Sequence, residues 1–171
     1  WRDWSSDVCS SDLSEIETPN LDRLAAGGLR FVDFHNNAKC SETRASILTG
    51  LWHQQSRNLK QPGHVTLAEV LRGAGYRTLM SGKWHVADTP PQRGFDRYFG
   101  FLSGAINFFT GADWQTGENL MRLGEKEFQP PDDFYSTDAF TDYAIQFINE
   151  SDKQEKPRQP FFLYLAHNAP H

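Results

Sequence analysis

The chain has 171 residues, 38% of them hydrophobic and 13% aromatic, which is enough for one globular domain with an apolar core. Its formal net charge of −5 favours neither nucleic acid nor an anionic membrane as a partner. No apolar run approaches the roughly 20 residues that a membrane-spanning helix needs, and two cysteines, Cys9 and Cys40, make no disulfide framework. Composition therefore indicates a globular domain and leaves its function open.

Residues 1–13 are polar, rich in serine and without a periodic apolar face. We expect this segment to be a disordered or non-native tail, with Trp1 and Trp4 exposed to solvent. The pattern of a folded protein begins at residue 14.

The first folded elements follow directly. Thr18 and Pro19 predict the start of a helix that Gly27 ends. Residues 29–35 alternate between apolar and polar side chains, which predicts a strand. Residues 41–50 predict a second, short helix.

A third helix and a strand come next. Thr66 and Glu69 form a capping box at the start of a helix over residues 66–75. Its predicted apolar face consists of Leu67, Val70, Leu71 and Ala74. Residues 76–85 suit a buried strand whose end carries polar groups.

The second half of the chain starts with a long irregular region. Residues 86–133 are rich in proline, glycine and aspartate and predict loops with little regular structure. Residues 136–150 are the clearest helix, residues 151–160 a charged linker, and residues 161–171 a buried strand that runs out into a polar end. Because helices alternate with strands, we predict an α/β fold with a central, mostly parallel sheet flanked by helices.

Three polar clusters stand at the start of a predicted helix or the end of a predicted strand. They are Cys40 with Arg44, Lys83 with His85, and His167 with His171. In open α/β sheets, ligands bind beyond the carboxyl ends of the strands. A nucleophile, cations and imidazoles at that edge together suit an anionic substrate.

Cys40 stands at the start of its predicted helix, where free backbone N–H groups favour an anion. Arg44 lies one turn further along the same helix face, where its guanidinium could reach that anion. An isolated cysteine is also commonly a small buried residue without chemistry. From these residues alone, both interpretations stay open.

Lys83 and His85 flank Trp84, so in a strand both side chains point to the same face. A neighbouring lysine lowers the pKa of a histidine, which suits a group that accepts or relays a proton, although an exposed strand end has the same pattern. His167 and His171 could be two ligands of a metal ion, but no cysteine cluster accompanies them, and the zinc interpretation is weak.

Five blocks of the chain are similar to one enzyme family. "CSETRASILTG" resembles a signature in which Cys-x-Pro-x-Arg is followed by Leu-Thr-Gly. The other blocks are "TPNLDRLAAGGLRF", "TLAEVLRGAGYRTLMSGKWH", "RGFDRYFGFLSGA" and "PFFLYLAHNAPH". Together, over about residues 15–171 and in unbroken order, they resemble the type I sulfatases, formylglycine-dependent and arylsulfatase-like members of the alkaline-phosphatase-like superfamily.

The resemblance implies a sulfuric ester hydrolase in which a maturation enzyme oxidises Cys40 to formylglycine. One hydroxyl of the hydrated aldehyde would attack the sulfur, and a covalent sulfo-enzyme would follow. By the same resemblance, Arg44 would hold the formylglycine oxygens and His85 would assist the release of sulfate. Lys83 would bind a sulfate oxygen, and His171 would bind the leaving-group oxygen.

The resemblance also implies a divalent cation, usually calcium, that polarises the sulfate and has Cys40, as formylglycine, among its ligands. The sequence departs from the family at three points. Glu42 stands where the signature has proline, the paired metal-binding aspartates have no counterpart before residue 14, and the Asp-Asn metal pair would follow His171. These departures predict that residues 14–171 are part of an N-terminal catalytic domain, truncated at both ends and inactive by itself.

Other functions stay open beside the sulfatase. A phosphonate or phosphate ester hydrolase of the same superfamily is the first, because the fold does not choose between the two anions. Glu42 raises the hypothesis of a catalytically inactive homologue, and a cysteine-dependent hydrolase of another family is the third alternative. For the sulfatase, the expected substrate is a sulfated small molecule or carbohydrate, and the expected location is periplasmic or secreted.

Overall fold

The computed structural model shows an α/β chain whose described residues are 17–60, 63–152 and 159–171. The predictions for residues 1–13, including the exposure of Trp1 and Trp4, lie outside the described residues, as does most of the predicted linker over 151–160. Within the described part of the chain, no helix combines the length and the apolar character that crossing a membrane requires.

The chain divides into two compact units, Trp1–Ala38 and Lys39–His171. In the first unit, α1 (Pro19–Ala26) follows Thr18 as predicted. The strand predicted over residues 29–35 is wrong: the structure assigns no strand there. Alternation yields a strand only where a neighbouring strand takes up the backbone hydrogen bonds. The apolar side chains of this segment are all exposed: Leu29, Phe31, Val32 and Phe34.

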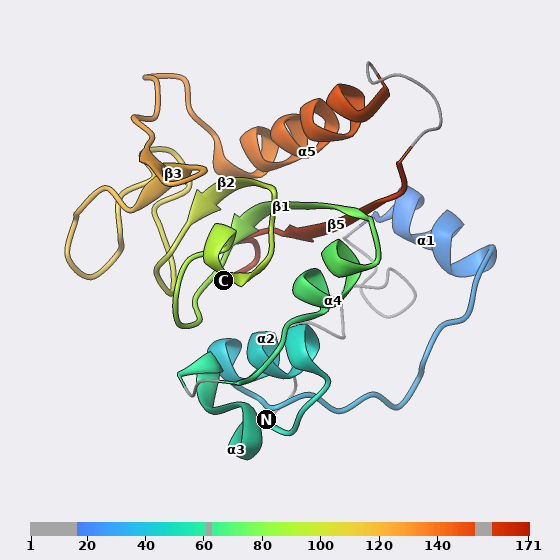
Figure 1. The fold of residues 1–171 in the computed structure, drawn as a ribbon. Helices are drawn as coiled ribbons and strands as arrows, with labels where there is room; N and C mark the ends of the chain where they lie inside the picture. Colours follow the sequence, from blue (N-terminus) through green and yellow to red (C-terminus); the bar gives the residue numbers. More distant parts are fainter. Residues whose placement is uncertain (1–16, 61–62, 153–158) are drawn as a thin grey trace. The chain divides into compact units, whose positions relative to one another are not determined.

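The second unit is built on a five-stranded sheet with the order β4-β3-β2-β1-β5 (Figure 1). Its strands are β1 (Arg77–Lys83), β2 (Arg97–Phe101), β3 (Met121–Leu123), β4 (Lys126–Glu127) and β5 (Phe161–Ala166). β1 pairs in parallel with β2 and with β5, while β3 and β4 add an antiparallel edge. The predicted α/β class, with parallel strands at the centre of the sheet, is confirmed.

Helices cover both faces of this sheet. They are α2 (Cys40–Thr49), α3 (His53–Ser56), α4 (Leu67–Gly73) and α5 (Ser136–Asp152), with short 3₁₀ turns η1 (Arg57–Leu59) and η2 (Pro91–Arg93). α5 lies on one face of the sheet, and α4 and α2 lie on the other (Figure 1). The predicted helices α2, α4 and α5 are confirmed.

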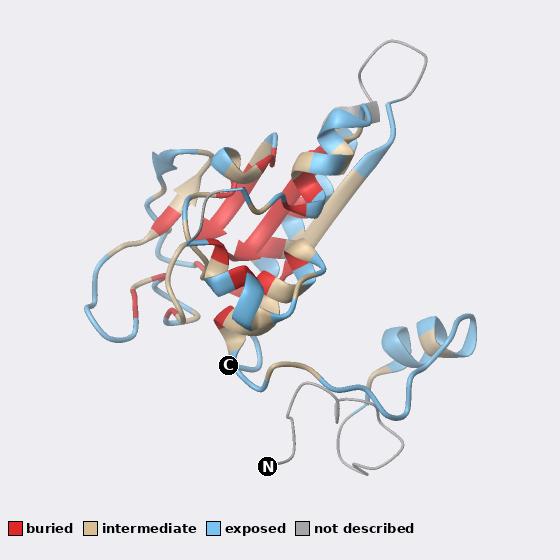
Figure 2. Cartoon of the chain, turned by 60° about the horizontal axis from the view of Figure 1, so that its bottom comes forward, coloured by how far each residue is buried: buried red, intermediate tan, exposed pale blue. Residues whose placement is uncertain are grey.

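Two apolar cores result, because successive strand residues point to opposite faces of a sheet. Leu79 of β1 belongs to the core on the α5 side, together with Phe140. The next residue, Met80, belongs to the opposite core, with Leu48 of α2 and Ala68 of α4. Figure 2 shows the central strands and the inner face of α5 buried, with exposed residues on the outer helix surfaces.

The capping box of α4 forms as predicted, but its predicted apolar face does not lie in the core. The Thr66 hydroxyl accepts a hydrogen bond from the Glu69 amide, and the Glu69 carboxylate accepts one from the Thr66 amide. Leu67 and Val70 are nevertheless 42% and 58% exposed, while Ala68 is fully buried. The Thr66 hydroxyl also donates to the Arg93 carbonyl, which ties the start of the helix to the segment after β1.

The region 86–133, predicted to lack regular structure, supplies β2, β3 and β4. β2 is buried on both faces, so its sequence, Arg97–Phe101, shows no alternation of polar and apolar residues. The opposite correction applies to β5, which was predicted to be buried. Among the described strands it pairs only with β1, at the sheet edge, and Phe161 and Leu165 are 43% and 39% exposed.

Three strands approach each other closely just before β1 ends. Gly82 pairs with Gly100 of β2 on one side and with Ala166 of β5 on the other. A Cβ atom on Gly82 would lie 2.0 Å from the Ala166 carbonyl oxygen, and one on Gly100 would lie 1.9 Å from the Gly82 carbonyl oxygen. Both residues also have positive φ angles, so only glycine fits.

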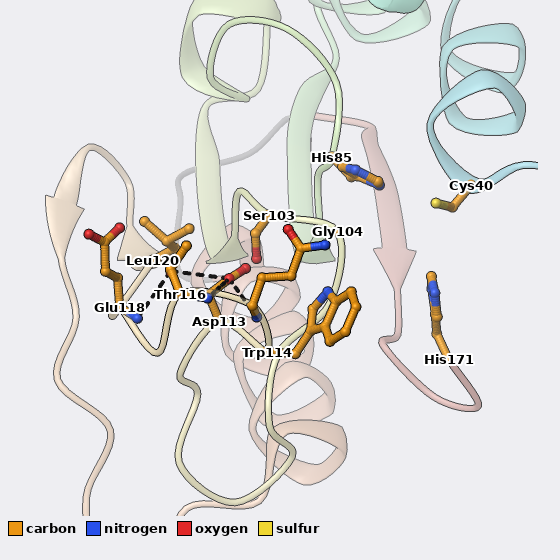
Figure 3. Close-up of a pocket in the computed structure, with 11 residues that line it drawn as sticks. Cys40, His85, Ser103, Gly104, Asp113, Trp114, Thr116, Glu118, Leu120 and His171 are labelled. Carbon is orange, nitrogen blue, oxygen red and sulfur yellow. Dashed lines mark hydrogen bonds between the residues drawn. The ribbon is translucent and has the colours of Figure 1, made fainter.

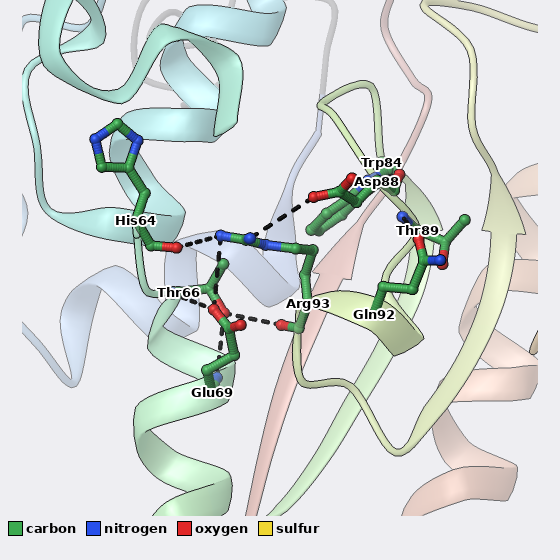
Figure 4. Close-up of polar contacts among 8 residues, drawn as sticks. All are labelled: His64, Thr66, Glu69, Trp84, Asp88, Thr89, Gln92 and Arg93. Carbon is green, nitrogen blue, oxygen red and sulfur yellow. Dashed lines mark hydrogen bonds and ion pairs between the residues drawn. The ribbon is translucent and has the colours of Figure 1, made fainter. Parts of the chain in front are cut away.

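The segment after β1 is anchored by Arg93 (Figure 4). Its guanidinium nitrogens lie 3.6 Å from the carboxylates of Glu69 and of Asp88, and one of them donates to the His64 carbonyl. The Asp88 carbonyl in turn accepts from the Trp84 indole at 2.9 Å. We call Arg93, Glu69 and Asp88 the Arg93 cluster; it ties the loop that follows β1 to the start of α4.

Candidate active site

A cavity of about 360 Å³ lies where β1, β2 and β5 end (Figure 3). Its walls come from the start of α2, the segments that follow β1 and β5, and the loop between β2 and β3. The lining residues are Cys40, His85, Ser103, Gly104, Asp113, Trp114, Gln115, Thr116, Glu118, Leu120 and His171. This is the edge of a parallel sheet at which ligands commonly bind.

Cys40 is the first residue of α2 and carries a free, half-buried thiol. The first backbone N–H groups of a helix have no partner within the helix, so this position favours a negative charge. Glu42 turns toward its neighbours: it accepts a hydrogen bond from Ser41 at 2.7 Å and pairs with Lys39 at 3.4 Å. Although burial opposes the change, these contacts lower the pKa of Glu42, which therefore adds a negative charge to this helix turn.

Arg44 connects α2 to the ends of two strands. Its guanidinium donates to the Lys83 carbonyl at 2.6 Å and to the Tyr164 hydroxyl at 3.3 Å. Arg44 is not among the residues that line the cavity. It therefore supplies positive charge from behind the wall, and the predicted contact with the Cys40 side chain stays a prediction.

Lys83 is only 1% exposed, and its ammonium nitrogen lies 2.8 Å from Nδ1 of His171. Burial, and then the charge of Arg44, lower the pKa of Lys83 to about 8, against a smaller opposing effect of Cys40. Among the described residues, Lys83 pairs with no carboxylate. Lys83 is not among the residues that line the cavity. It is a buried cation behind His171, and its counter-charge has to come from elsewhere.

The contact with Lys83 fixes the tautomer of His171. An ammonium group can only donate, so Nδ1 of His171 accepts, and the ring proton sits on Nε2. Burial, together with the charges of Lys83 and Arg44, lowers the pKa of His171. The ring is therefore neutral near pH 7, and its Nε2–H is a hydrogen-bond donor for a ligand in the cavity.

His85 has a strained backbone and a tightly confined ring. Its φ angle is +56°, which is uncommon for a residue other than glycine. Burial first, and then the neighbouring cations Lys83 and Arg44, lower its pKa to about 4. A Cβ atom on Gly104 would lie 3.1 Å from the ring. The structure thus holds a neutral imidazole, able to accept a proton, against the cavity.

Sequence reasoning missed the opposite wall, because residues 86–133 were read as irregular loops. Asp113, 7% exposed, accepts hydrogen bonds from the Gln115 amide and from the amide and hydroxyl of Thr116. The Thr116 amide in particular lowers the pKa of Asp113, although burial opposes it. The signal in the sequence was a single aspartate between two glycines, Gly111 and Gly117, a turn pattern that is common in loops.

The comparisons with known proteins identify the family of the chain. Residues 3–171 match the family model described as Sulfatase. The chain belongs to the sulfatase family. An arylsulfatase of Klebsiella aerogenes is 33% identical over 98% of this chain and 41% of its own length. An N-acetylglucosamine-6-O-sulfatase of Bacteroides thetaiotaomicron is 33% identical over 91% of this chain and 26% of its own length.

A solved structure, of a protein in complex with its substrate D-glucosamine-2-N,6-O-disulfate, is 33% identical to this sulfatase chain with a TM-score of 0.66. The alignment covers 91% of this chain and 30% of that one. The chain therefore spans less than half the length of these relatives. The resemblance seen in the sequence blocks is confirmed, and so is the fold.

The cation that sulfatases generally use finds no ready site among the described residues, where no group of three or more His, Cys, Asp or Glu side chains comes together. The groups closest to Lys83 are cationic or neutral, which does not suit a metal ion. His167 packs near Phe140 and does not line the cavity, so it does not join His171 there. The structure therefore gives no support to His167 and His171 as a pair of zinc ligands, an interpretation that was already weak from the sequence.

Proposed function

We propose that the full-length protein hydrolyses sulfate esters, and that this part of it supplies the nucleophile and the groups that bind the sulfate. The observation that carries the proposal is the buried ammonium of Lys83, which contacts His171, and His171 lines the same cavity as Cys40. A buried charge without an opposite charge is unfavourable. A sulfate group in the cavity would supply the missing negative charge and accept a charge-assisted hydrogen bond.

Under this proposal, Cys40 is oxidised by a maturation enzyme to formylglycine, which supplies a hydroxyl nucleophile for the sulfur. Lys83 donates to a sulfuryl oxygen, and Arg44 adds positive charge from behind Lys83. The Nε2–H of His171 donates to the leaving-group oxygen. His85, neutral near pH 7, accepts the proton of the second formylglycine hydroxyl as sulfate is released and the aldehyde forms again. Such preorganised donors are commonly the largest contribution to catalysis of this kind.

A divalent cation, calcium by family resemblance, is part of the proposal only for the complete protein. Cys40 would be its single ligand in this chain, and the carboxylate ligands would come from other parts of the protein. A Lewis acid contributes several kcal/mol to charge stabilisation. We therefore expect residues 14–171 alone to hydrolyse no sulfate ester at a useful rate.

The substrate we propose is a sulfated carbohydrate. Support comes from the relative named N-acetylglucosamine-6-O-sulfatase and from the solved complex with a glucosamine disulfate. The arylsulfatase relative keeps a simple aryl sulfate as the alternative. By the same resemblance, we expect the protein to be periplasmic or secreted.

The test uses full-length protein that is co-produced with an active maturation enzyme. We would measure turnover of matched sulfate, phosphate and phosphonate esters, and the mass of the peptide that contains Cys40, with Cys40→Ala as control. Sulfate turnover together with conversion of the thiol to an aldehyde supports the proposal. Preferred turnover of phosphate or phosphonate esters would show the alternative hydrolase.

Two further outcomes separate the remaining alternatives. An unmodified Cys40 without turnover would show an inactive homologue, in which Glu42 has replaced the proline of the signature. Turnover that thiol alkylation abolishes would show a cysteine-dependent hydrolase, because formylglycine has no thiol to alkylate.

A further inference from the structure

The wall of the cavity opposite Cys40 presents an aromatic side chain that the proposed chemistry does not use. Trp114 lies in the segment between β2 and β3, which we call loop 103–120. Its indole lines the cavity and is 65% exposed. Figure 3 shows it on the side of the cavity that faces Cys40 and His171.

The backbone around Trp114 is held in place on both sides. The Trp114 amide donates to the Ala105 carbonyl at 3.3 Å, and Asp113 forms a bridge with Ile106. The Asp113 carboxylate closes the turn that follows, through the amides of Gln115 and Thr116 at 3.0 and 2.8 Å. An exposed aromatic ring on a backbone fixed in this way needs little ordering to contact a ligand.

One residue sets the spacing between this wall and the catalytic one. Asn168 is 2% exposed, and its side-chain amide donates to the Ile106 carbonyl at 3.1 Å. The backbone carbonyl of Asn168 accepts a hydrogen bond from the His171 amide at 2.9 Å. Loop 103–120 and His171 are therefore tied to the same buried residue.

We propose that Trp114 determines specificity, by stacking its indole on the sugar ring of the ester's alcohol part while His171 binds the leaving-group oxygen. This inference rests on the proposed function. Aromatic faces pack on flat apolar surfaces, and one face of a sugar ring is such a surface. Gln115 and Glu118 on the same wall offer an amide and a carboxylate to hydroxyl groups. A simple aryl ring has no such hydroxyls, so Gln115 and Glu118 favour a sugar.

The test compares Trp114→Ala and Trp114→Phe in the full-length protein on glucosamine 6-sulfate, phenyl sulfate and an alkyl sulfate. We expect Trp114→Ala to lower kcat/KM for the sugar ester about tenfold, mainly through KM. Trp114→Phe should keep most of the activity, and the other two esters should change much less. Trp52→Ala is the matched control: Trp52 is 75% exposed but does not line the cavity.

An equal loss on all three esters would overturn the proposal, since Trp114 would then act through the fold alone. A larger loss on phenyl sulfate than on the sugar ester would overturn the choice of a sugar. If the full-length protein hydrolyses no sulfate ester, the proposed function fails, and calorimetry with glucosamine 6-sulfate decides about Trp114. Weaker binding by Trp114→Ala than by wild type and Trp52→Ala would support the stacking of Trp114 on the sugar. Equal affinities, or no binding by wild type, would overturn it.

Discussion

Lys83 and Arg93 are both largely buried cations, but their surroundings differ. The Arg93 guanidinium lies within 3.6 Å of two carboxylates, those of Glu69 and Asp88. The Lys83 ammonium contacts the imidazole of His171 and lies near a second cation, Arg44. Among the described residues, Arg93 has carboxylates beside it and Lys83 has none.

The difference fits a structural role for Arg93 and the sulfate-binding role that we propose for Lys83. A buried charge that has partners links segments together, whereas a buried charge without an opposite charge costs free energy. The fold accepts that cost at Lys83, where an anionic substrate can supply the missing charge. Perturbed groups of this kind are concentrated at functional sites.

The largest expected effect is that of Lys83→Met on catalysis. Removing one preorganised donor to the sulfuryl oxygen should lower kcat about 10²- to 10³-fold. Methionine fills the space of the lysine stem without a charge, so the variant should fold. Turnover and the midpoint of thermal unfolding of the full-length protein would be measured together. An active variant with a lowered midpoint would show that Lys83 has a structural role instead.

A second expectation concerns alkaline pH. If protonated Lys83 binds the sulfate, kcat/KM should fall about tenfold per pH unit above pH 8, where Lys83 loses its proton. Stability should change in the opposite direction. Between about pH 8 and the ordinary lysine value of 10.5, the unfolded state binds more protons, so the Lys83 contribution to stability rises with pH.

The measurement is a pH profile of turnover beside urea midpoints at the same pH values. Lys83→Arg, whose guanidinium keeps its proton, should lose the alkaline decline even if its turnover is lower. A decline that persists unchanged in Lys83→Arg would assign it to another group.

In the Arg93 cluster, the expected effect is on stability. Arg93→Met removes the cation from between Glu69 and Asp88 and leaves the His64 carbonyl without its donor. Because both carboxylates are partly exposed, water screens part of the loss, and we expect the free energy of unfolding to fall by about 1–3 kcal/mol. Urea unfolding measures it, with Arg93→Lys as a control that keeps the charge. A loss of turnover as large as that of Lys83→Met, at unchanged stability, would erase the distinction between the two cations.

The smallest expected effect is at Gly104. An added methyl group would stand 3.1 Å from the His85 ring and push it from its place. Gly104→Ala should therefore lower kcat by about tenfold or less, with little change in stability. Gly73→Ala in α4, where an added Cβ atom meets nothing within 4 Å, is the matched control. Equal turnover in both variants would show that the position of the ring is unimportant.

Local signals in the sequence predicted the elements that depend on local physics. The spacing of apolar residues predicted α5, the Thr66–Glu69 capping box predicted the start of α4, and residues 76–85 were predicted to be the buried strand that the structure shows as β1. The same signals failed where a distant partner decides. Residues 29–35 alternate but have no neighbouring strand, and β2 does not alternate because it is buried on both faces.

The site was predictable to a similar extent. Cys40, His85 and His171 could be placed at one edge of the sheet, because strand ends and helix starts in an α/β fold meet there. Trp114 and Asn168 could not. Trp114 is positioned by its amide bond to Ala105 and the adjacent Asp113–Ile106 bridge, and Asn168 by its bond to Ile106, 62 residues away. No periodic pattern in the sequence reveals such contacts.

The row formed by Gly82, Gly100 and Ala166 affects how a mutational scan of this protein should be read. Substitutions at Gly82 or Gly100 would force strands apart directly beside Lys83. A library scored only by turnover would rank both glycines as essential, although neither lines the cavity. Counting the soluble protein of each variant alongside its turnover would separate the positions that build the sheet from those that meet the substrate.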